Sequence, residues 1–458
     1  MRRRMFVAFF VLALVFRLAI AFALKSGSTH TVMETIARKF RGVAQPDIWN
    51  GNIRTEMEEI ALNVAEFGDY NLYGVPTAHC TPVFPLYLAG LFSIFGTGLL
   101  AQIVKVMLTC AVSALRCGLV PLFAIDAGFD PRIGALAGGM SVLYIGALDT
   151  DISGGVDGPF VAIALLILVW ATLRIWRDGS WKARTLWWFI AFCGFCALLN
   201  PNLLPVIGGF VLAGAVACPA AVRRRYFRQT ALLALGILAF LSPWAIRNYL
   251  SLGAPIMTRS NFGIEFWVSN GPGRTFDLSR NYGTYHPSNS PIEAATLVDL
   301  GEVKYNRLKL AEAIDWVRAH TGNFLLFTAQ RFAAWWFPPL PGMLMTPFLV
   351  LTLLAFTGLW LMFRHQSLVA WLFLLTWITF PDVYYLVQWS SRYRCPMDWQ
   401  ILLCASVALF AAYQAAVGRL SGPRSRQRRG QAGKAQNVSA GRGDRNRWNV
   451  SYYLLEKR

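Results

Sequence analysis

The first residues that could do chemistry are acids on one face of a predicted helix. Over residues 54–67 apolar residues recur at helical spacing, which leaves Glu56, Glu59, Asn63 and Glu66 together on the opposite face. Carboxylates one helical turn apart can take up a proton or hold a cation. A solvated helix presents the same polar face, so the pattern alone leaves both interpretations open.

A second group of acids lies in a short segment between two apolar stretches. Asp149, Asp151 and Asp157 fall within nine residues of one another. Such a group could position a nucleophilic acceptor or hold a divalent metal ion. Ordinary solvated loop charges would look the same.

Four arginines lie at the ends of apolar stretches: Arg247, Arg259, Arg392 and Arg394. The planar guanidinium binds two phosphate oxygens at once, so these residues are candidates for holding a phosphate. The alternative for each is a side chain that extends to lipid headgroups. Because residues i and i+2 align in an extended chain, we expect Arg392 and Arg394 to point to one side.

The elements that must position these residues are long apolar runs. Of the 458 residues, 55% are hydrophobic and 15% are charged, whereas about a quarter are charged in a soluble domain. About 20 apolar residues cross a bilayer as a helix, because the backbone must satisfy its own hydrogen bonds there. We therefore predict an all-α, polytopic transmembrane bundle of about ten spans: 5–24, 99–125, 131–148, 156–176, 185–199, 202–221, 230–247, 344–362, 367–387 and 397–417.

These spans divide the chain into alternating membrane and outer segments. The first span (1–24) precedes an outer loop (25–98), spans two to seven (99–247) precede a second one (248–343), and spans eight to ten (344–417) precede a basic tail (418–458) predicted to be disordered. Apolar stretches 82–96 and 323–337 are predicted as interfacial helices. The net charge of +19 falls almost entirely on the side of the termini. The positive-inside bias explains it and predicts cytoplasmic termini, contact with membrane lipid and no nucleic-acid partner.

Cysteine and histidine spacing predicts no metal centre. Cys193 and Cys196 match a C-x-x-C pattern within an apolar span, where small packing residues are the simpler interpretation. Cys80 and Cys395 both fall near the outer surface, and whether they pair is left open. The five histidines are scattered, so no zinc site is expected. No cofactor is certain, while a divalent metal held by carboxylates remains open. Lys105 and Arg116 lie within a span without an assigned role.

Several motifs in order resemble those of a known group. They are the proline-rich stretch from Val75 to Gly96, the sequence from Ser242 to Tyr249, Arg259 to Trp267, and Ser391-Arg-Tyr-Arg-Cys-Pro396. Over residues 1–417 the chain resembles bacterial C-type (GT-C) membrane glycosyltransferases, which include the lipid A aminoarabinose transferases and the protein O-mannosyltransferases. Cys395 stands where histidine is common in that group.

The resemblance implies an activity and assigns the candidate residues. It implies transfer of a sugar from a polyprenyl-phosphate donor to a lipid, glycan or protein acceptor on the periplasmic face of a bacterial inner (plasma) membrane. Glu56 matches the acid of the first loop and would deprotonate the acceptor, with Glu59 in reserve. The four arginines would stabilise the departing phosphate. Because the donor arrives on a lipid, no nucleotide-binding loop is needed, and no glycine-rich loop here follows a plausible strand.

Three other functions fit a multi-span chain with large outer loops. One is a transporter or flippase of lipid-linked glycans, although no internal repeat is visible. Another is an O-antigen-type polymerase, which would use a diphosphate-linked donor. The third is a non-catalytic relative, in which the acids and arginines do not converge.

Overall fold

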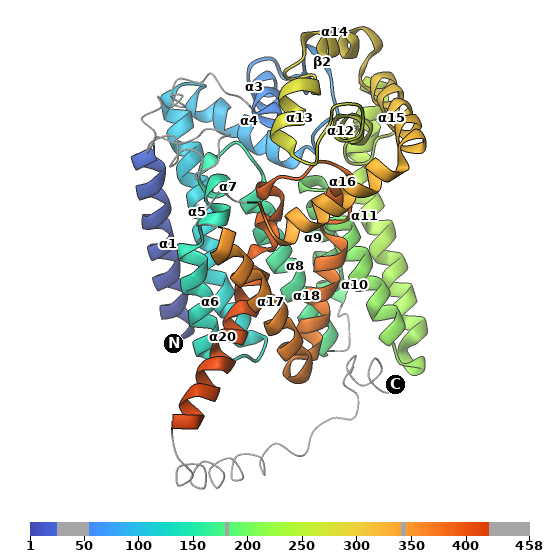
Figure 1. The fold of residues 1–458 in the computed structure, drawn as a ribbon. Coiled ribbons are helices and arrows are strands. Elements are labelled where there is room, and N and C mark those ends of the chain that lie inside the picture. Colours follow the sequence, from blue (N-terminus) through green and yellow to red (C-terminus); the bar gives the residue numbers. More distant parts are fainter. Residues whose placement is uncertain (25–54, 179–182, 340–344, 421–458) are drawn as a thin grey trace.

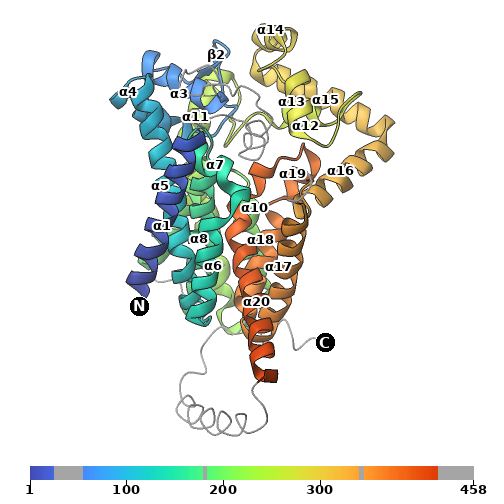
Figure 2. The same cartoon turned by 60° about the vertical axis from the view of Figure 1, so that its left-hand side comes forward.

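The computed structural model describes residues 1–24, 55–178, 183–339 and 345–420, which are almost entirely helical. A bundle of long helices carries a layer of shorter elements over one end (Figures 1 and 2). The expected all-α polytopic fold is therefore confirmed. The bundle contains α1 (Arg2–Leu24), α5 (Leu99–Asp126), α6 (Pro131–Leu143), α7 (Leu148–Ser153), α8 (Gly158–Asp178), α9 (Ala183–Leu199), α10 (Leu203–Ala217), α11 (Arg223–Leu252), α17 (Met345–His365), α18 (Ser367–Thr379), α19 (Asp382–Leu386) and α20 (Asp398–Leu420).

The shorter elements form what we call the outer layer, residues 55–98 and 253–339. In the first stretch are α3 (Glu56–Phe67), β1 (Asn71–Leu72), β2 (Val75–Pro76) and α4 (Val83–Phe95). In the second are α12 (Phe262–Ser269), α13 (Leu278–Tyr285), α14 (Pro291–Leu300), α15 (Glu302–Ala319) and α16 (Thr321–Trp336). The expected interfacial segments 82–96 and 323–337 are thus helices, α4 and most of α16. The predicted tail lies outside the described residues.

Seven described helices are long and apolar enough to cross a membrane, and α6 with residues 145–153 makes an eighth if their 50° bend lies within one span. All ten predicted spans contain a helix. Two of them, α9 and α10, have only 17 and 15 residues, fewer than the about 20 needed to cross the hydrocarbon. The break between them falls at Asn200-Pro201, where proline cannot continue the preceding helix.

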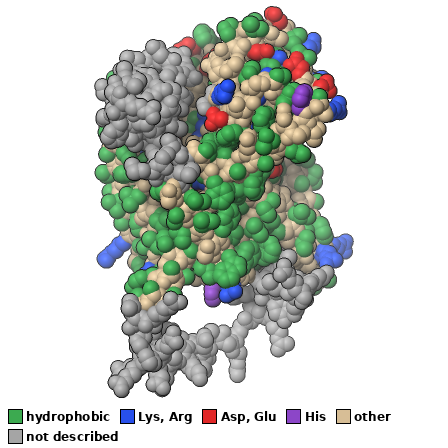
Figure 3. All heavy atoms as spheres, viewed as in Figure 1, with side chains coloured by type: hydrophobic (Ala, Val, Ile, Leu, Met, Phe, Trp, Pro, Cys, Tyr) green, Lys and Arg blue, Asp and Glu red, His purple; other side chains and the backbone are tan. Residues whose placement is uncertain are grey.

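The surface of the bundle is suited to lipid. Leu12, Val15, Leu212 and Leu235 are each more than half exposed. On the face shown in Figure 3, a broad hydrophobic zone covers the bundle, and acidic side chains gather on the outer layer. The start of α1 and the end of α20 lie together at the opposite end (Figure 1). This arrangement is that of a membrane protein whose outer layer stands at one bilayer face.

Close helix contact holds the bundle together. Lipid is as apolar as a leucine side chain, so helix association in a membrane depends on van der Waals packing rather than on the hydrophobic effect. Gly358 on α17 faces Cys404 on α20, and a β-carbon at Gly358 would lie 1.7 Å from the Cys404 carbonyl oxygen. Rings of Phe123, Phe373 and Trp399 pack at centroid distances of 5.2 to 6.0 Å. The bundle that supports the outer layer is therefore a closely packed one.

Buried ion pairs account for the charges within the predicted spans. Asp151 is fully buried and accepts hydrogen bonds from Arg17 and Arg116, which come from α1 and α5. Lys105, at the outer end of α5, pairs with Glu58 of α3. Charges at such depths need partners. These pairs fasten α1, α7 and the outer helix α3 to α5.

The predicted helix over 54–67 forms with both ends capped. The Thr55 hydroxyl accepts from the Glu58 amide, and the Glu58 carboxylate accepts from the Thr55 amide, a reciprocal capping box. Gly68, at φ 77°, ends the helix. The β1–β2 hairpin that follows turns through Tyr73 and Gly74, both with positive φ, as two-residue hairpin loops require.

The cysteines are buried and free, which bears on two sequence motifs. Cys193 and Cys196 are 0% exposed within α9. Cys80 and Cys395 are separate free thiols in this structure. Cys193 and Cys196 are thus consistent with small packing residues, while Cys395 Sγ also accepts from Arg116 Nη1 at 3.4 Å.

Candidate active site and cation site

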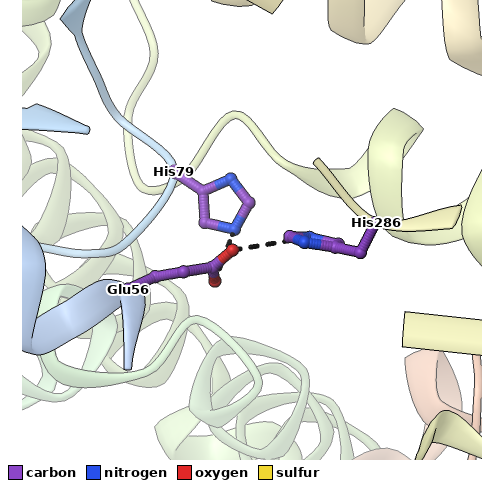
Figure 4. Close-up of side chains that lie close together, drawn as sticks. All are labelled: Glu56, His79 and His286. Carbon is purple, nitrogen blue, oxygen red and sulfur yellow. Dashed lines mark ion pairs between the residues drawn. The ribbon is translucent and has the colours of Figure 1, made fainter. Parts of the chain in front are cut away.

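Three side chains from distant parts of the chain meet in the outer layer: Glu56, His79 and His286 (Figure 4). Glu56 Oε2 lies 3.1 Å from His79 Nε2, and Glu56 Oε1 lies 3.5 Å from His286 Nε2. The two imidazole side chains are almost fully buried, whereas the Glu56 side chain is 17% exposed. We call these residues the Glu-His-His triad.

Each member of the triad is placed by a different element. Glu56 opens the capped helix α3. His79 follows β2 in a segment held by the buried Glu302, which accepts from the Ala78 amide at 2.8 Å and from the Thr77 hydroxyl. His286 follows α13 and stacks on the Tyr282 ring at 4.2 Å. The site therefore exists only when both stretches of the outer layer are in place.

Hydroxyl groups surround the triad. Ser288 Oγ lies 2.9 Å from Glu56 Oε1, 3.0 Å from His286 Nδ1 and 2.5 Å from Tyr73 Oη. Tyr73 Oη also donates to Glu56 Oε1 at 3.1 Å. Tyr73 reaches this position with φ 55°, a backbone conformation that costs a non-glycine residue free energy and needs support from its surroundings. Both Glu56 oxygens thus already accept hydrogen bonds or ion pairs.

Burial and neighbouring charges give the three members of the triad different protonation states. Burial alone would raise the pKa of Glu56, but His79, His286 and the Ser288 hydroxyl lower it well below its usual value. Burial opposes the charge of His79, yet Glu56 raises the pKa of His79 to about 9. Burial lowers the pKa of His286. Near neutral pH, Glu56 is a carboxylate, His79 an imidazolium and His286 a neutral imidazole.

The triad also offers the ligands of a metal site. One ligand atom from each residue lies within 4.8 Å of the other two. His286 Nε2 is buried and lacks a hydrogen-bond partner among the described residues. Two imidazoles and a carboxylate are a donor set that suits zinc and similar divalent ions. Ser288 fixes the orientation of that ring, because its amide donates to His286 Nδ1 at 3.2 Å and its hydroxyl lies 3.0 Å from the same atom.

Arg259 retains unused hydrogen-bond donors near the top of the bundle, where Arg392 also lies. Arg259 Nε and Nη2 are buried without a partner among the described residues. Arg392 contacts the Tyr393 hydroxyl at 3.4 Å, and Tyr393 stacks on Tyr384 at 4.4 Å. Burial opposes the charge of Arg259, but its neighbours raise its pKa, so it remains a cation. Tyr282, next to the triad, interacts electrostatically with both Glu56 and Arg392, which places triad and arginines in one region.

Arg247 and Arg394 are occupied by the protein itself. Arg247 donates to the carbonyls of Thr77 and Tyr70 at 2.6 and 2.8 Å. Arg394 donates to Asp398, Tyr144 and the carbonyl of residue 335. The expectation that Arg392 and Arg394 share one side is wrong, because residues 391–397 form a 3-10 helix rather than an extended strand. Arg394 consequently turns into the bundle while Arg392 does not.

The remaining predicted acids lie in different surroundings. Glu59 accepts from the Tyr73 amide at 3.4 Å and so contacts the hairpin. Asp149 is partly exposed on α7, whereas Asp151 is sealed within the bundle. Asp157 precedes α8 and accepts from Asn200 Nδ2 at 3.0 Å. Burial raises the pKa of Asp157, although the nearby Arg259 and Arg392 act to lower it. Asp157 is therefore the one of these four acids that lies beside the arginines.

Sequence reasoning missed both histidines of the triad and also Glu265. His79 and His286 have no ligand partner at a close spacing, so no local pattern identifies them. Glu265 lies within the motif from Arg259 to Trp267, but nothing in its sequence separates it from a solvated acid. For His79 and Glu265 the available sequence signal is their place within the motifs from Val75 to Gly96 and from Arg259 to Trp267.

Comparison with known proteins adds a distant structural likeness. No protein-family profile and no curated protein matches the chain. Two structures of the archaeal oligosaccharyltransferase AglB from Archaeoglobus fulgidus are similar at 14% identity. One, in complex with an inhibitory peptide and a dolichol-phosphate, has a TM-score of 0.46; the other, in the apo form, has 0.48. Each alignment covers 99% of this chain and 54% of AglB, so the chain spans about half of that protein's length.

Proposed function

We propose that this protein is a membrane glycosyltransferase that moves a sugar from a polyprenyl-phosphate donor to a lipid, glycan or protein acceptor. The observation that carries the proposal is Arg259, whose two buried nitrogens lack a partner among the described residues, with Arg392 in the same region. Buried donors without partners are costly and imply a ligand that completes them. A phosphate is the anion that the guanidinium fork fits best.

The position of the arginines favours a lipid-linked donor. They lie where the apolar bundle meets the outer layer, so a phosphate could reach them while its polyprenyl tail stays in the membrane. Arg259 and Arg392 would stabilise the charge on the departing phosphate, which is usually the largest contribution to such a reaction. Asp157, close to Arg259, would orient that guanidinium.

We also propose that the Glu-His-His triad binds a divalent cation such as zinc. His286 Nε2 supports this, because it is buried without a hydrogen bond, 3.5 Å from Glu56 Oε1, and a metal would bind both atoms. When bound, such an ion would act as a Lewis acid or a fixed positive charge. The saturated carboxylate and lowered pKa of Glu56 suit a ligand better than a proton acceptor, so we reassign Glu56 from base to cation ligand.

The orientation we propose is that of a bacterial inner-membrane protein. Arg2, Arg174, Arg223 and Arg364 lie at the end of the bundle opposite the outer layer, and basic residues favour the cytoplasmic side. The outer layer with its triad would then face the periplasm.

The test is transfer in vitro by the purified full chain. Synthetic polyprenyl-monophosphate glucose, mannose, galactose and arabinose would be compared with the matching diphosphate donors, with total membrane lipid extract as acceptor. We expect transfer from a monophosphate donor, and a fall in kcat/KM of about 100-fold for Arg259→Gln. Arg280→Gln is the matched control, since Arg280 is an exposed arginine of the same outer layer, and it should stay within about twofold.

Other outcomes would identify the alternatives. Transfer from diphosphate donors alone would indicate a polymerase. Movement of labelled donor lipid across a vesicle, without any transfer, would indicate a flippase. Either result overturns the proposal.

A further inference from the structure

Glu265 is a carboxylate that the structure holds with neutral groups only. It lies on α12, where Gln388 Nε2 donates to Oε2 at 2.9 Å and Asn261 Nδ2 donates to Oε1 at 3.3 Å. Among the described residues no ion pair from a lysine, arginine or histidine reaches it. Its side chain is partly exposed, so a ligand can approach. Two amides fix its direction while leaving lone pairs on both oxygens.

Apart from Asp157, which accepts from the Asn200 amide beside Arg259, the other inward-facing acids of the site are occupied. Asp151 accepts from two arginines, and Glu58 pairs with Lys105. Glu302 accepts from two hydroxyls and an amide. Glu56 is held by the triad and its hydroxyl shell. A group that takes a proton during a reaction needs an oxygen within reach of the substrate, and Glu265 provides one.

Glu265 also lies between the two halves of the site. Asn261 Nδ2, which donates to Glu265, is 3.5 Å from His79 Nε2 of the triad. On its other side Glu265 interacts electrostatically with both Arg259 and Arg392. A substrate phosphate on the arginines and a cation on the triad would therefore flank this carboxylate.

A second observation indicates that something binds beside Glu265. Gln388 is 0% exposed, and while its Nε2 donates to Glu265, its Oε1 is buried without a partner among the described residues. A buried amide oxygen without a donor is costly. A hydroxyl or amine in this place would supply the missing donor, and an acceptor substrate carries such a group.

We propose that Glu265 is the catalytic base that takes the proton from the acceptor nucleophile; this inference rests on the proposed function. The acceptor O–H or N–H gives its proton to the Glu265 carboxylate. The freed electron pair forms the bond to the anomeric carbon. The bond from that carbon to the phosphate oxygen breaks, and its electron pair leaves on the lipid phosphate, beside Arg259 and Arg392. The protonated Glu265 then releases its proton to water.

The experiment uses azide, a nucleophile that carries no proton to remove. The full-length protein and its Glu265→Gln variant would be given a synthetic polyprenyl-phosphate sugar, with and without sodium azide. We expect Glu265→Gln to lower transfer to membrane acceptor about 100- to 10,000-fold, and azide to restore release of polyprenyl phosphate, with glycosyl azide as product, at least tenfold. Glu265→Asp should keep part of the activity.

Matched variants separate this role from binding or folding. Arg259→Gln should not be rescued by azide, because it lacks the phosphate contact. Donor binding by Glu265→Gln, measured with polyprenyl phosphate alone, should stay within about threefold. If wild-type protein transfers sugar and Glu265→Gln is equally active, or is inactive and not rescued, the base assignment is overturned while the transferase function stands. If wild-type protein transfers from no monophosphate donor, both proposals fail together.

Discussion

Replacing Asp151 by Asn should destabilise the bundle without altering the site. Asp151 is 0% exposed and accepts hydrogen bonds of 2.8 to 3.1 Å from Arg17 and Arg116. Without its charge, two buried guanidiniums would face each other. Breaking a buried ion pair by removing one partner costs about 3–5 kcal/mol, and the two cations here place the expected loss near the upper end, about 4–5 kcal/mol.

The loss should be visible as an earlier melting transition. At roughly 2.1 cal/mol/K per residue, unfolding of a chain of 458 residues carries an entropy of roughly 1 kcal/mol/K. A loss of about 4 kcal/mol then lowers Tm by roughly 4 °C. The assay is tryptophan fluorescence during heating of the detergent-purified protein, with Ser153→Ala on the same short helix as the control.

A second substitution tests the electrostatic cause. Adding Arg17→Met to Asp151→Asn removes one of the two unpaired cations, so the double variant should be less destabilised than the sum of the two single variants by about 1–3 kcal/mol. Folded Asp151→Asn should keep donor affinity and zinc content. Unchanged melting together with lost zinc or donor binding would refute this reasoning and return Asp151 to the acceptor or metal site.

Three further outcomes are expected. His286→Gln should weaken zinc binding by at least about 100-fold, because one of three ligands is lost. Metal analysis of the purified protein after dialysis measures the effect. Equal zinc content in the variant and the wild type would show that the triad is not the zinc site. Arg394→Gln should lower the free energy of unfolding by about 3–5 kcal/mol, since Asp398 would be left buried without its cation, and should leave polyprenyl-phosphate affinity unchanged. Arg392→Gln should instead lower polyprenyl-phosphate affinity and leave stability unchanged. If the two variants have the same effects, the assignment of Arg394 to structure and Arg392 to donor binding is contradicted. Glu302→Gln should lower zinc affinity and donor affinity by about tenfold each, because one carboxylate holds the segments of both His79 and Arg259. A hydrogen bond to a charged group contributes about 1.5–3 kcal/mol. Loss of only one of the two affinities would show that the two segments are fixed separately.

Properties that depend on neighbours in sequence could be predicted, and those that depend on distant neighbours could not. Apolar runs predicted the helices, and the apolar spacing over 54–67 agrees with α3, which the structure shows to be capped by Thr55. The predicted span 185–199 and the break at Asn200-Pro201 agree with α9, whereas the predicted span 202–221 was too long, because α10 ends at Ala217, before Pro219. Hydropathy also gave no role to Arg116, whose partner Asp151 is supplied by another helix.

The candidate site illustrates the same limit. Glu56 was singled out by the face of its helix, yet its partners His79 and His286 come from the segments after β2 and α13, and only the fold joins them. Arginines at span ends could be named, but which have free donors depends on local backbone. The 3-10 turn over 391–397 sends Arg394 inward and leaves Arg392 available. The roles of the predicted residues therefore remain predictions, now with a defined geometry.

The Glu-His-His triad bridges the two stretches of the outer layer, and this has a consequence for biosynthesis. A ribosome releases Glu56 and His79 long before His286, so a nascent chain offers an incoming ion only two ligands until α13 has emerged. For the cation site proposed above, binding of the ion would therefore be a late step of assembly. Chains halted before that point would carry the bundle helices only as far as α11, and no closed coordination site.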